Sequence, residues 1–374
     1  MVRLFALLTG MALGAVSCSQ GQSAAPSAPV RGTAYTLLAN NQLLAVSLAT
    51  GRILSSVRLG VVPEGSRGVG HLMALSPEHH QLVALVSGGR PGADSVAFLA
   101  IPGLDVQATR PVPEPDVTYQ GLAVGEQSGR IYLFGNRIRG VALDPAHGPP
   151  SDAVVTVLDP TGSQVIYNWT VRPAEGRDWF VLRGAVASDE RRLFVSYHGP
   201  DTQGMDIFSI GPSGPQQCQP SPDPSSGCVR LHGDFEVYRD GFLAATGGPE
   251  ILQLSSEGSV QRTFNTGLKN NHLMEFVVNR TSNQLYAAGS CGYVPGLSLV
   301  NLASGETHLL VPLGGAICGE RIALAAAPVI VILRLQLPVP PPKTPGVLLV
   351  VDGSNGKLQQ RVATPSGPID VIVS

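Results

Sequence analysis

The chain has 374 residues, of which 43% are hydrophobic and 14% are charged, and its formal net charge at pH 7 is -2. This apolar content is enough for a large core, while 44 glycines and 31 prolines interrupt the chain at short intervals and favour strands and turns over helices. The near-neutral charge, without a run of lysines or arginines, excludes nucleic acid as a partner.

The N-terminus has the organisation of a signal peptide. Arg3 supplies a positive charge, residues 4–15 form an apolar stretch, and small residues then precede Cys18. This pattern resembles the bacterial lipoprotein signal, in which the cysteine is acylated and becomes the new N-terminus. The alternatives are an ordinary secretory signal with a chance cysteine, or a membrane helix, although the stretch is shorter than the roughly 20 residues that span a bilayer.

We therefore expect residues 1–17 to be a signal peptide and Cys18 to carry a lipid. Residues 18–32, rich in Ser, Ala, Gln and Pro, are expected to form a flexible tether. The expected location is extracytoplasmic, anchored through the lipid to a bacterial membrane.

From residue 33 onward one pattern recurs, in which an apolar stretch, a polar turn and a second apolar stretch follow one another. Its copies are spaced by about 45 to 65 residues, a period typical of propeller-like repeats. The copies lie at residues 71–85, 120–134, 183–195, 272–287 and, more loosely, 320–333. Each copy predicts two strands joined by a tight turn.

A second kind of hairpin follows most copies and carries a glycine in its turn, where a positive φ is needed. Its examples are residues 44–54, 154–166, 297–309 and 348–358. Two hairpins per repeat make a four-stranded sheet, which is the unit of a β-propeller.

Counting these units gives seven. Six are continuous, at residues 70–112, 118–172, 180–233, 234–268, 272–313 and 318–364. The seventh is split, because residues 33–60 supply three strands and residues 367–374 supply the missing first strand. The sequence therefore predicts an all-β fold, a single seven-bladed β-propeller over residues 33–374 whose first blade is closed by the C-terminal strand. Closure removes the open sheet edges that invite aggregation.

The turns of these units resemble those of the YVTN-type seven-bladed propellers, a broad superfamily of extracytoplasmic repeat proteins. The resemblance covers residues 33–374 and rests on Leu75-Ser-Pro-Glu, on the turn at residues 186–195, and on the Ala-Thr-Gly-Arg and Ala-Ser-Gly-Glu turns. It implies blades and not an activity. The pyrroloquinoline-quinone dehydrogenases fit less well, because they carry a Trp in each blade and this chain has only Trp169 and Trp179.

Four further cysteines would lie in an oxidising compartment and are disulfide candidates. They are Cys218, Cys228, Cys291 and Cys318, and they allow three pairings. A Cys218–Cys228 bridge would staple a loop with little core-forming power, and a Cys291–Cys318 bridge would tie neighbouring repeats. A metal site is the alternative, but the cysteine spacing does not support one, so we expect no metal.

Polar residues begin the predicted innermost strands and should surround the mouth of the central channel. They are His71, Gln120, Arg183, His272, Glu320 and Asp370. Such a ring can bind a small molecule, a metal or a peptide carboxylate, or it can simply be hydrated. We found no catalytic motif among these residues and expect no cofactor.

The sequence favours a non-enzymatic binding or scaffolding module for a protein or an envelope component, acting as a membrane-tethered monomer. One alternative is a lactonase-like hydrolase, in which Arg183, a histidine and a carboxylate act at the channel mouth. Another is a sensor of a small ligand or metal at the same place.

Overall fold

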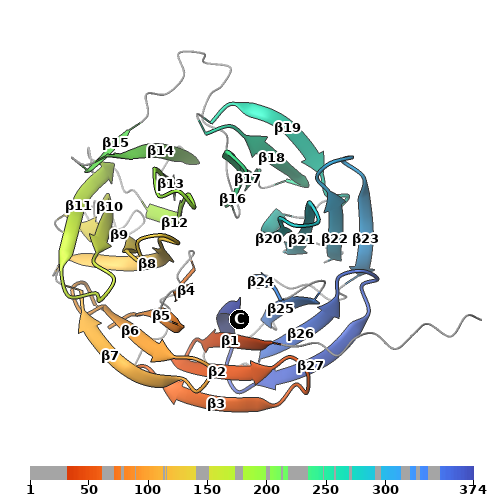
Figure 1. Cartoon of the computed structure of the whole chain (residues 1–374), viewed down its shortest axis with the longest axis horizontal. Coiled ribbons are helices and arrows are strands. Elements are labelled where there is room, and N and C mark those ends of the chain that lie inside the picture. Colours follow the sequence, from red (N-terminus) through yellow and green to blue (C-terminus); the bar gives the residue numbers. More distant parts are fainter. Residues whose placement is uncertain are drawn as a thin grey trace, which may run out of the picture.

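The fold is known from a computed structural model, which describes residues 32–60, 71–76, 80–88, 90–112, 114, 116–139, 151–172, 180–198, 203–211, 214–217, 235–246, 248–256, 258–268, 272–290, 296–312, 321–325, 329–335 and 346–374. The described residues form four-stranded antiparallel sheets that stand in a ring around a common centre (Figure 1). Within these ranges, no helix has the length and apolar character needed to span a bilayer.

Six sheets each use four consecutive strands. The first two contain β4 (Met73–Ser76), β5 (Gln81–Val86), β6 (Ser95–Ala100) and β7 (Asp105–Pro111), then β8 (Val117–Val124), β9 (Ile131–Ile138), β10 (Ser151–Leu158) and β11 (Val165–Arg172). The next two contain β12 (Phe180–Val186), β13 (Arg192–His198), β14 (Gln203–Gly211) and β15 (Gly214–Gln217), then β16 (Phe235–Tyr238), β17 (Gly241–Ala245), β18 (Glu250–Leu254) and β19 (Val260–Asn265). The last two contain β20 (His272–Asn279), β21 (Gln284–Ser290), β22 (Gly296–Asn301) and β23 (Thr307–Pro312), then β24 (Arg321–Leu324), β25 (Val329–Leu335), β26 (Gly346–Asp352) and β27 (Leu358–Thr364).

A seventh sheet joins the two ends of the chain. It contains β1 (Thr33–Leu38), β2 (Gln42–Ser47), β3 (Ile53–Arg58) and β28 (Pro368–Val373), in the order β28-β1-β2-β3. The pairing of β28 with β1 is antiparallel and places Val371 opposite Thr36 and Ile372 opposite Tyr35. The prediction of an all-β propeller of four-stranded blades, closed by the C-terminal strand, is confirmed.

The turn glycines of the second hairpins adopt the backbone conformation that the sequence predicts. Gly51, Gly162, Gly305 and Gly356 have φ values of +67°, +68°, +83° and +73°. An L-residue with a side chain rarely adopts this left-handed region, so glycine is what allows these turns to be tight.

The core lies between neighbouring blades, because the side chains of each strand alternate between the two faces of its sheet. On β13, Leu193 packs back against Tyr132 of the preceding blade. The next residue, Phe194, packs forward against Phe242, with ring centroids 4.7 Å apart. Burying a side chain of this size stabilises the fold by about 2 kcal/mol, and the pattern recurs at each junction around the ring.

Candidate functional site

The seven inner strands, β4, β8, β12, β16, β20, β24 and β28, surround a cavity of about 510 Å³ on the axis of the ring. Strand register brings one residue from each of them to the same level of this cavity. These residues, which we call the middle ring, are Ala74, Ala123, Ala185, Glu236, Val277, Ala323 and Ile372. Most of them have small side chains, so space remains between the strands. The cavity has the size of a site for a small molecule.

The wall of the cavity is largely apolar, with polar groups toward its ends. His71 precedes β4 at one end, while Glu126 and Arg280 follow β8 and β20 at the other. Arg280 donates a hydrogen bond of 2.9 Å to the backbone carbonyl of Val237, which fixes its guanidinium at the rim. In the middle ring, Glu236 is the one charged side chain, and its Oε2 accepts the backbone N–H of Val278 at 2.9 Å.

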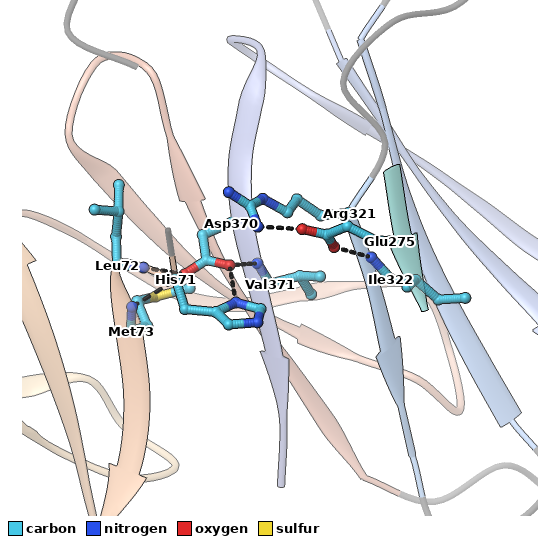
Figure 2. Close-up of polar contacts among 8 residues, drawn as sticks. All are labelled: His71, Leu72, Met73, Glu275, Arg321, Ile322, Asp370 and Val371. Atoms are coloured by element: carbon cyan, nitrogen blue, oxygen red, sulfur yellow. Dashed lines mark hydrogen bonds and ion pairs between the residues drawn. The ribbon is translucent and has the colours of Figure 1, made fainter. Parts of the chain in front are cut away.

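Asp370 lies at the mouth where His71 is found, but its carboxylate points sideways into the junction with the next blade (Figure 2). The residue is 1% exposed. Its Oδ2 accepts the backbone N–H groups of Leu72 at 2.6 Å and of Met73 at 3.0 Å. Its Oδ1 is 3.1 Å from Nδ1 of His71 and accepts the N–H of Val371 at 2.9 Å. Asp370 therefore joins the closing strand β28 to β4 of the next blade.

The ionisation of Asp370 is decided by opposing effects. Burial alone would raise the pKa of this carboxyl, but the charge and hydrogen bond of His71, the charge of Arg321 and the backbone donors outweigh it and hold the pKa below its ordinary value. The group is therefore an anion at neutral pH. Because an anionic carboxylate only accepts hydrogen bonds, Nδ1 of His71 carries the hydrogen in this contact.

Glu275 makes the corresponding contact two blades earlier in the ring. It pairs with Arg321, and its Oε2 accepts the backbone N–H of Ile322 at 3.0 Å (Figure 2). Glu275 is 4% exposed, and the Arg321 side chain is 11% exposed. Glu236 and Val278 repeat this arrangement at the middle ring. In all three cases a carboxylate on one inner strand accepts a backbone N–H from the inner strand of the next blade.

Asp94 provides a fourth contact of this kind from outside the inner strands. It accepts the backbone N–H groups of Gly88 at 3.0 Å and of Tyr119, at the start of the next blade, at 2.8 Å. Here burial raises the pKa of the carboxyl, and the hydrogen bonds only partly oppose it. Among the described residues, the pKa of Asp94 is set by burial and hydrogen bonds, whereas the pKa of Asp370 is also lowered by positive charge nearby.

The structure places the residues that were predicted to surround the channel mouth in several different environments, which are described one by one below. His71 and Asp370 are brought into contact. Gln120 lies in the irregularity between Tyr119 and Gly121, where β8 changes register against β9. Arg183 pairs through its backbone with Ser196 of β13.

His272 begins β20, and the side chains of His272 and Arg183 lie outside the described residues. Glu320, the four candidate disulfide cysteines and Cys18 also lie outside them. Ligand binding by the ring therefore stays a prediction, and so do the lipid and the disulfides.

Glu275 and Arg321 are mouth residues that the repeat pattern did not predict. In strand register, Glu275 opposite Ala288 occupies the level of Arg183 opposite Ser196, whereas His272 lies at the far end of its strand. The register shift between Leu273 and Glu275 in β20 corresponds to the one between Val181 and Arg183 in β12. Matching the segment Glu275-Phe-Val-Val-Asn to Arg183-Gly-Ala-Val-Ala in the sequence would have predicted Glu275 as the residue at this level.

No family model matches the chain, and no curated protein matches it either. Solved structures do match. A functionally unknown protein from Desulfotomaculum acetoxidans is 12% identical, with a TM-score of 0.61 over 92% of this chain and 98% of that one. A putative 6-phosphogluconolactonase from Bacteroides uniformis is 12% identical, with a TM-score of 0.57 over 93% of this chain and 100% of that one.

Apo AztD from Citrobacter koseri is 14% identical, with a TM-score of 0.51 over 92% of this chain and 98% of that one. At these identities the likeness to solved structures shows the fold alone. The chain is a β-propeller.

Proposed function

We propose that the protein is an extracytoplasmic binding module, tethered to a bacterial membrane through Cys18, that holds its ligand in the central channel. The observation that carries this proposal is the cavity of about 510 Å³ enclosed by all seven inner strands. Four of the seven middle-ring residues are alanines, and they leave a space that larger side chains would fill. The mouth carboxylates Asp370 and Glu275 already accept backbone donors, which favours binding over catalysis by these acids.

The chemistry of the wall indicates the kind of ligand. An apolar body matches the alanine, valine and isoleucine side chains, and a polar group at either end would meet His71 or Arg280. A small amphipathic molecule or the end of a peptide has this shape, including one that belongs to an envelope protein or envelope component. Apolar pockets with a few fixed polar groups are the usual form of such sites.

Filling the channel tests this proposal. Ala185 lies in the middle ring, so Ala185→Leu should occupy part of the cavity, whereas Ala363→Leu changes an exposed alanine of the outer strand β27 and serves as the control. A thermal-shift screen of amphipathic molecules and peptides would first identify ligands. A ligand present at about 100 times its Kd stabilises the native state by about 2.7 kcal/mol. We expect this shift in the wild type and in Ala363→Leu, and an equal shift in Ala185→Leu would refute binding in the channel.

The membrane tether and the family are supported by the sequence. Cys18 follows a short apolar stretch after Arg3, and the blade turns support a place among the YVTN-type propellers. Labelling with a radioactive fatty acid tests the tether. We expect the label in the wild type and its loss in Cys18→Ser together with release from the membrane fraction, and a wild type without label would refute the anchor.

A second candidate function, hydrolysis, is favoured by the contact of His71 with Asp370. The carboxylate fixes Nδ1 as a donor, and the His71 side chain is 38% exposed and lines the cavity. A histidine held in this way has the arrangement of a general base. A screen of lactones and esters with His71→Gln tests it, because hydrolysis that survives this substitution unchanged would exclude His71 from the reaction.

A further inference from the structure

The hairpin turns between the inner and second strands meet one another on one face of the ring. In the turn before β13, Glu190 reaches back to the preceding blade and accepts the backbone N–H groups of Gln127 and Ser128, each at 2.7 Å. In the turn before β21, Asn283 does the same and accepts the hydroxyl of Tyr238 at 2.8 Å. At both junctions, an acceptor side chain of one blade holds the turn of the blade before it.

The junction between these two is built differently. Here the corresponding residue is Arg239, in the turn before β17, and its guanidinium is directed forward, 3.3 Å from Oδ1 of Asn283. It also lies over the ring of Tyr238, 5.0 Å from the ring centroid. Between the turn at residues 187–192 and the turn at residues 239–241 there is a cleft of about 650 Å³.

The cleft combines an apolar floor with charged walls. Its apolar side chains are Phe194, Ile210 and Val237, and its charged side chains are Asp189, Arg191, Arg192, Arg239 and Asp240. The residues that line the cleft therefore include three arginines and two aspartates. Asp189 already accepts the backbone N–H of Arg191 at 3.0 Å, within its own turn.

Arg239 occupies a backbone position that suits arginine poorly. Its φ is +55°, in the left-handed region, and the inner-hairpin turns of other blades place Asn41 (+58°), His80 (+48°), Glu190 (+54°) and Asn283 (+51°) in the same conformation. Asparagine tolerates this conformation better than residues with long side chains do. The conformation is a feature of these turns and not of Arg239 alone, because a histidine and a glutamate adopt it as well.

We propose that this cleft binds an oxyanion, a carboxylate or phosphate group carried by a ligand with an apolar body, between Arg191 and Arg239. The planar guanidinium has five N–H donors and matches the geometry of both groups. Stacking on Tyr238 and the contact with Asn283 hold Arg239 in place, and the residue lines the cleft. The site is separate from the central channel and does not depend on the function proposed for it.

Matched probes test the sign of the charge and the need for an apolar body. Isothermal titration calorimetry with benzoate, inorganic phosphate and benzylamine compares an apolar anion, a bare anion and an apolar cation. We expect benzoate or phosphate to bind, more weakly at high salt because the charges are screened. Binding of benzoate alone assigns a carboxylate ligand, and binding of phosphate alone assigns a phosphate ligand. Failure of both anions, or equal binding of benzylamine, would overturn the proposal.

Variants assign the binding to the cleft. We expect Arg191→Met to weaken the anion about tenfold or more, because it removes charge-assisted hydrogen bonds. Arg361→Met, on the outer strand of another blade, is the matched control and should leave the affinity unchanged. Arg239→Asn should weaken the anion while its melting temperature stays equal to the wild type or rises, since asparagine fits the positive φ. Undiminished affinity in both cleft variants would refute the site.

Discussion

Replacing Asp370 by alanine should weaken the junction between the closing strand β28 and β4, and the loss of stability follows from the contacts that are removed. The substitution leaves the inter-blade N–H groups of Leu72 and Met73 without their acceptor, and it removes the charge beside His71. Each unsatisfied buried donor costs about 1 to 3 kcal/mol. The expected loss in the free energy of unfolding is therefore about 2 to 6 kcal/mol, a large part of the stability of a typical domain.

The loss should depend on pH in a definite direction. His71, Arg321 and the backbone donors hold the pKa of Asp370 below its ordinary value despite burial, so the unfolded chain binds the proton more readily. The stability that the anion contributes is present above the ordinary carboxyl pKa of 3.8 and is lost as pH falls through the lower native pKa. The difference between wild type and Asp370→Ala should therefore shrink as pH falls below 3.8.

Urea unfolding at several pH values, followed by tryptophan fluorescence, measures the loss in the free energy of unfolding and its dependence on pH. Asp105→Ala changes an exposed aspartate on the outer strand β7 and should cost less than about 0.5 kcal/mol. Asp370→Asn should fall between the two, because one amide oxygen can still accept from Leu72 and Met73. A loss below about 1 kcal/mol for Asp370→Ala at neutral pH, or a loss that does not change with pH, would refute the role of this carboxylate.

Three further substitutions test the junctions between blades. Glu275→Gln should cost about 3 to 5 kcal/mol in urea unfolding, because Arg321 loses its carboxylate partner. Adding Arg321→Met should recover part of this loss. Strictly additive effects of the two substitutions would contradict the pairing. Gly184→Ala should cost about 1 to 3 kcal/mol, because a Cβ at this position would overlap the buried ring of Phe134. Thermal unfolding measures this loss, and an unchanged melting temperature would show that the strands can move apart. Tyr119→Phe should cost about 1 to 2 kcal/mol in urea by removing the hydrogen bond of 2.7 Å to a buried threonine hydroxyl on β10, and equal stability would mean that this bond contributes nothing net.

The strands were predictable because their causes are local. A glycine such as Gly51 or Gly305 marks a turn wherever the backbone needs a positive φ, and apolar residues on both sides of it mark the paired strands. The closure of the ring was predictable too, because residues 33–60 lack one strand and residues 367–374 supply one. Both inferences need only the spacing of residues along the chain.

The site was less predictable because it depends on register and on side-chain direction. The irregularity between Leu273 and Glu275 is the counterpart of the one between Val181 and Arg183, so Glu275 and not His272 matches Arg183, and this match is fixed by strand register. Similarly, the cleft beside Arg239 depends on which neighbouring turn this side chain contacts, and spacing along the chain carries no information on that choice.

The direction of the mouth carboxylates follows from the edges of the inner strands. Each inner strand pairs with a second strand on one side only, so the N–H groups on its other edge need acceptors from elsewhere. Asp370, Glu275 and Glu236 supply them to the next blade. An acidic residue at the start of an inner strand therefore has two possible uses, joining blades or binding a ligand. Substitution separates them, because loss of a blade contact lowers stability without any ligand present, whereas loss of a ligand contact changes only the affinity.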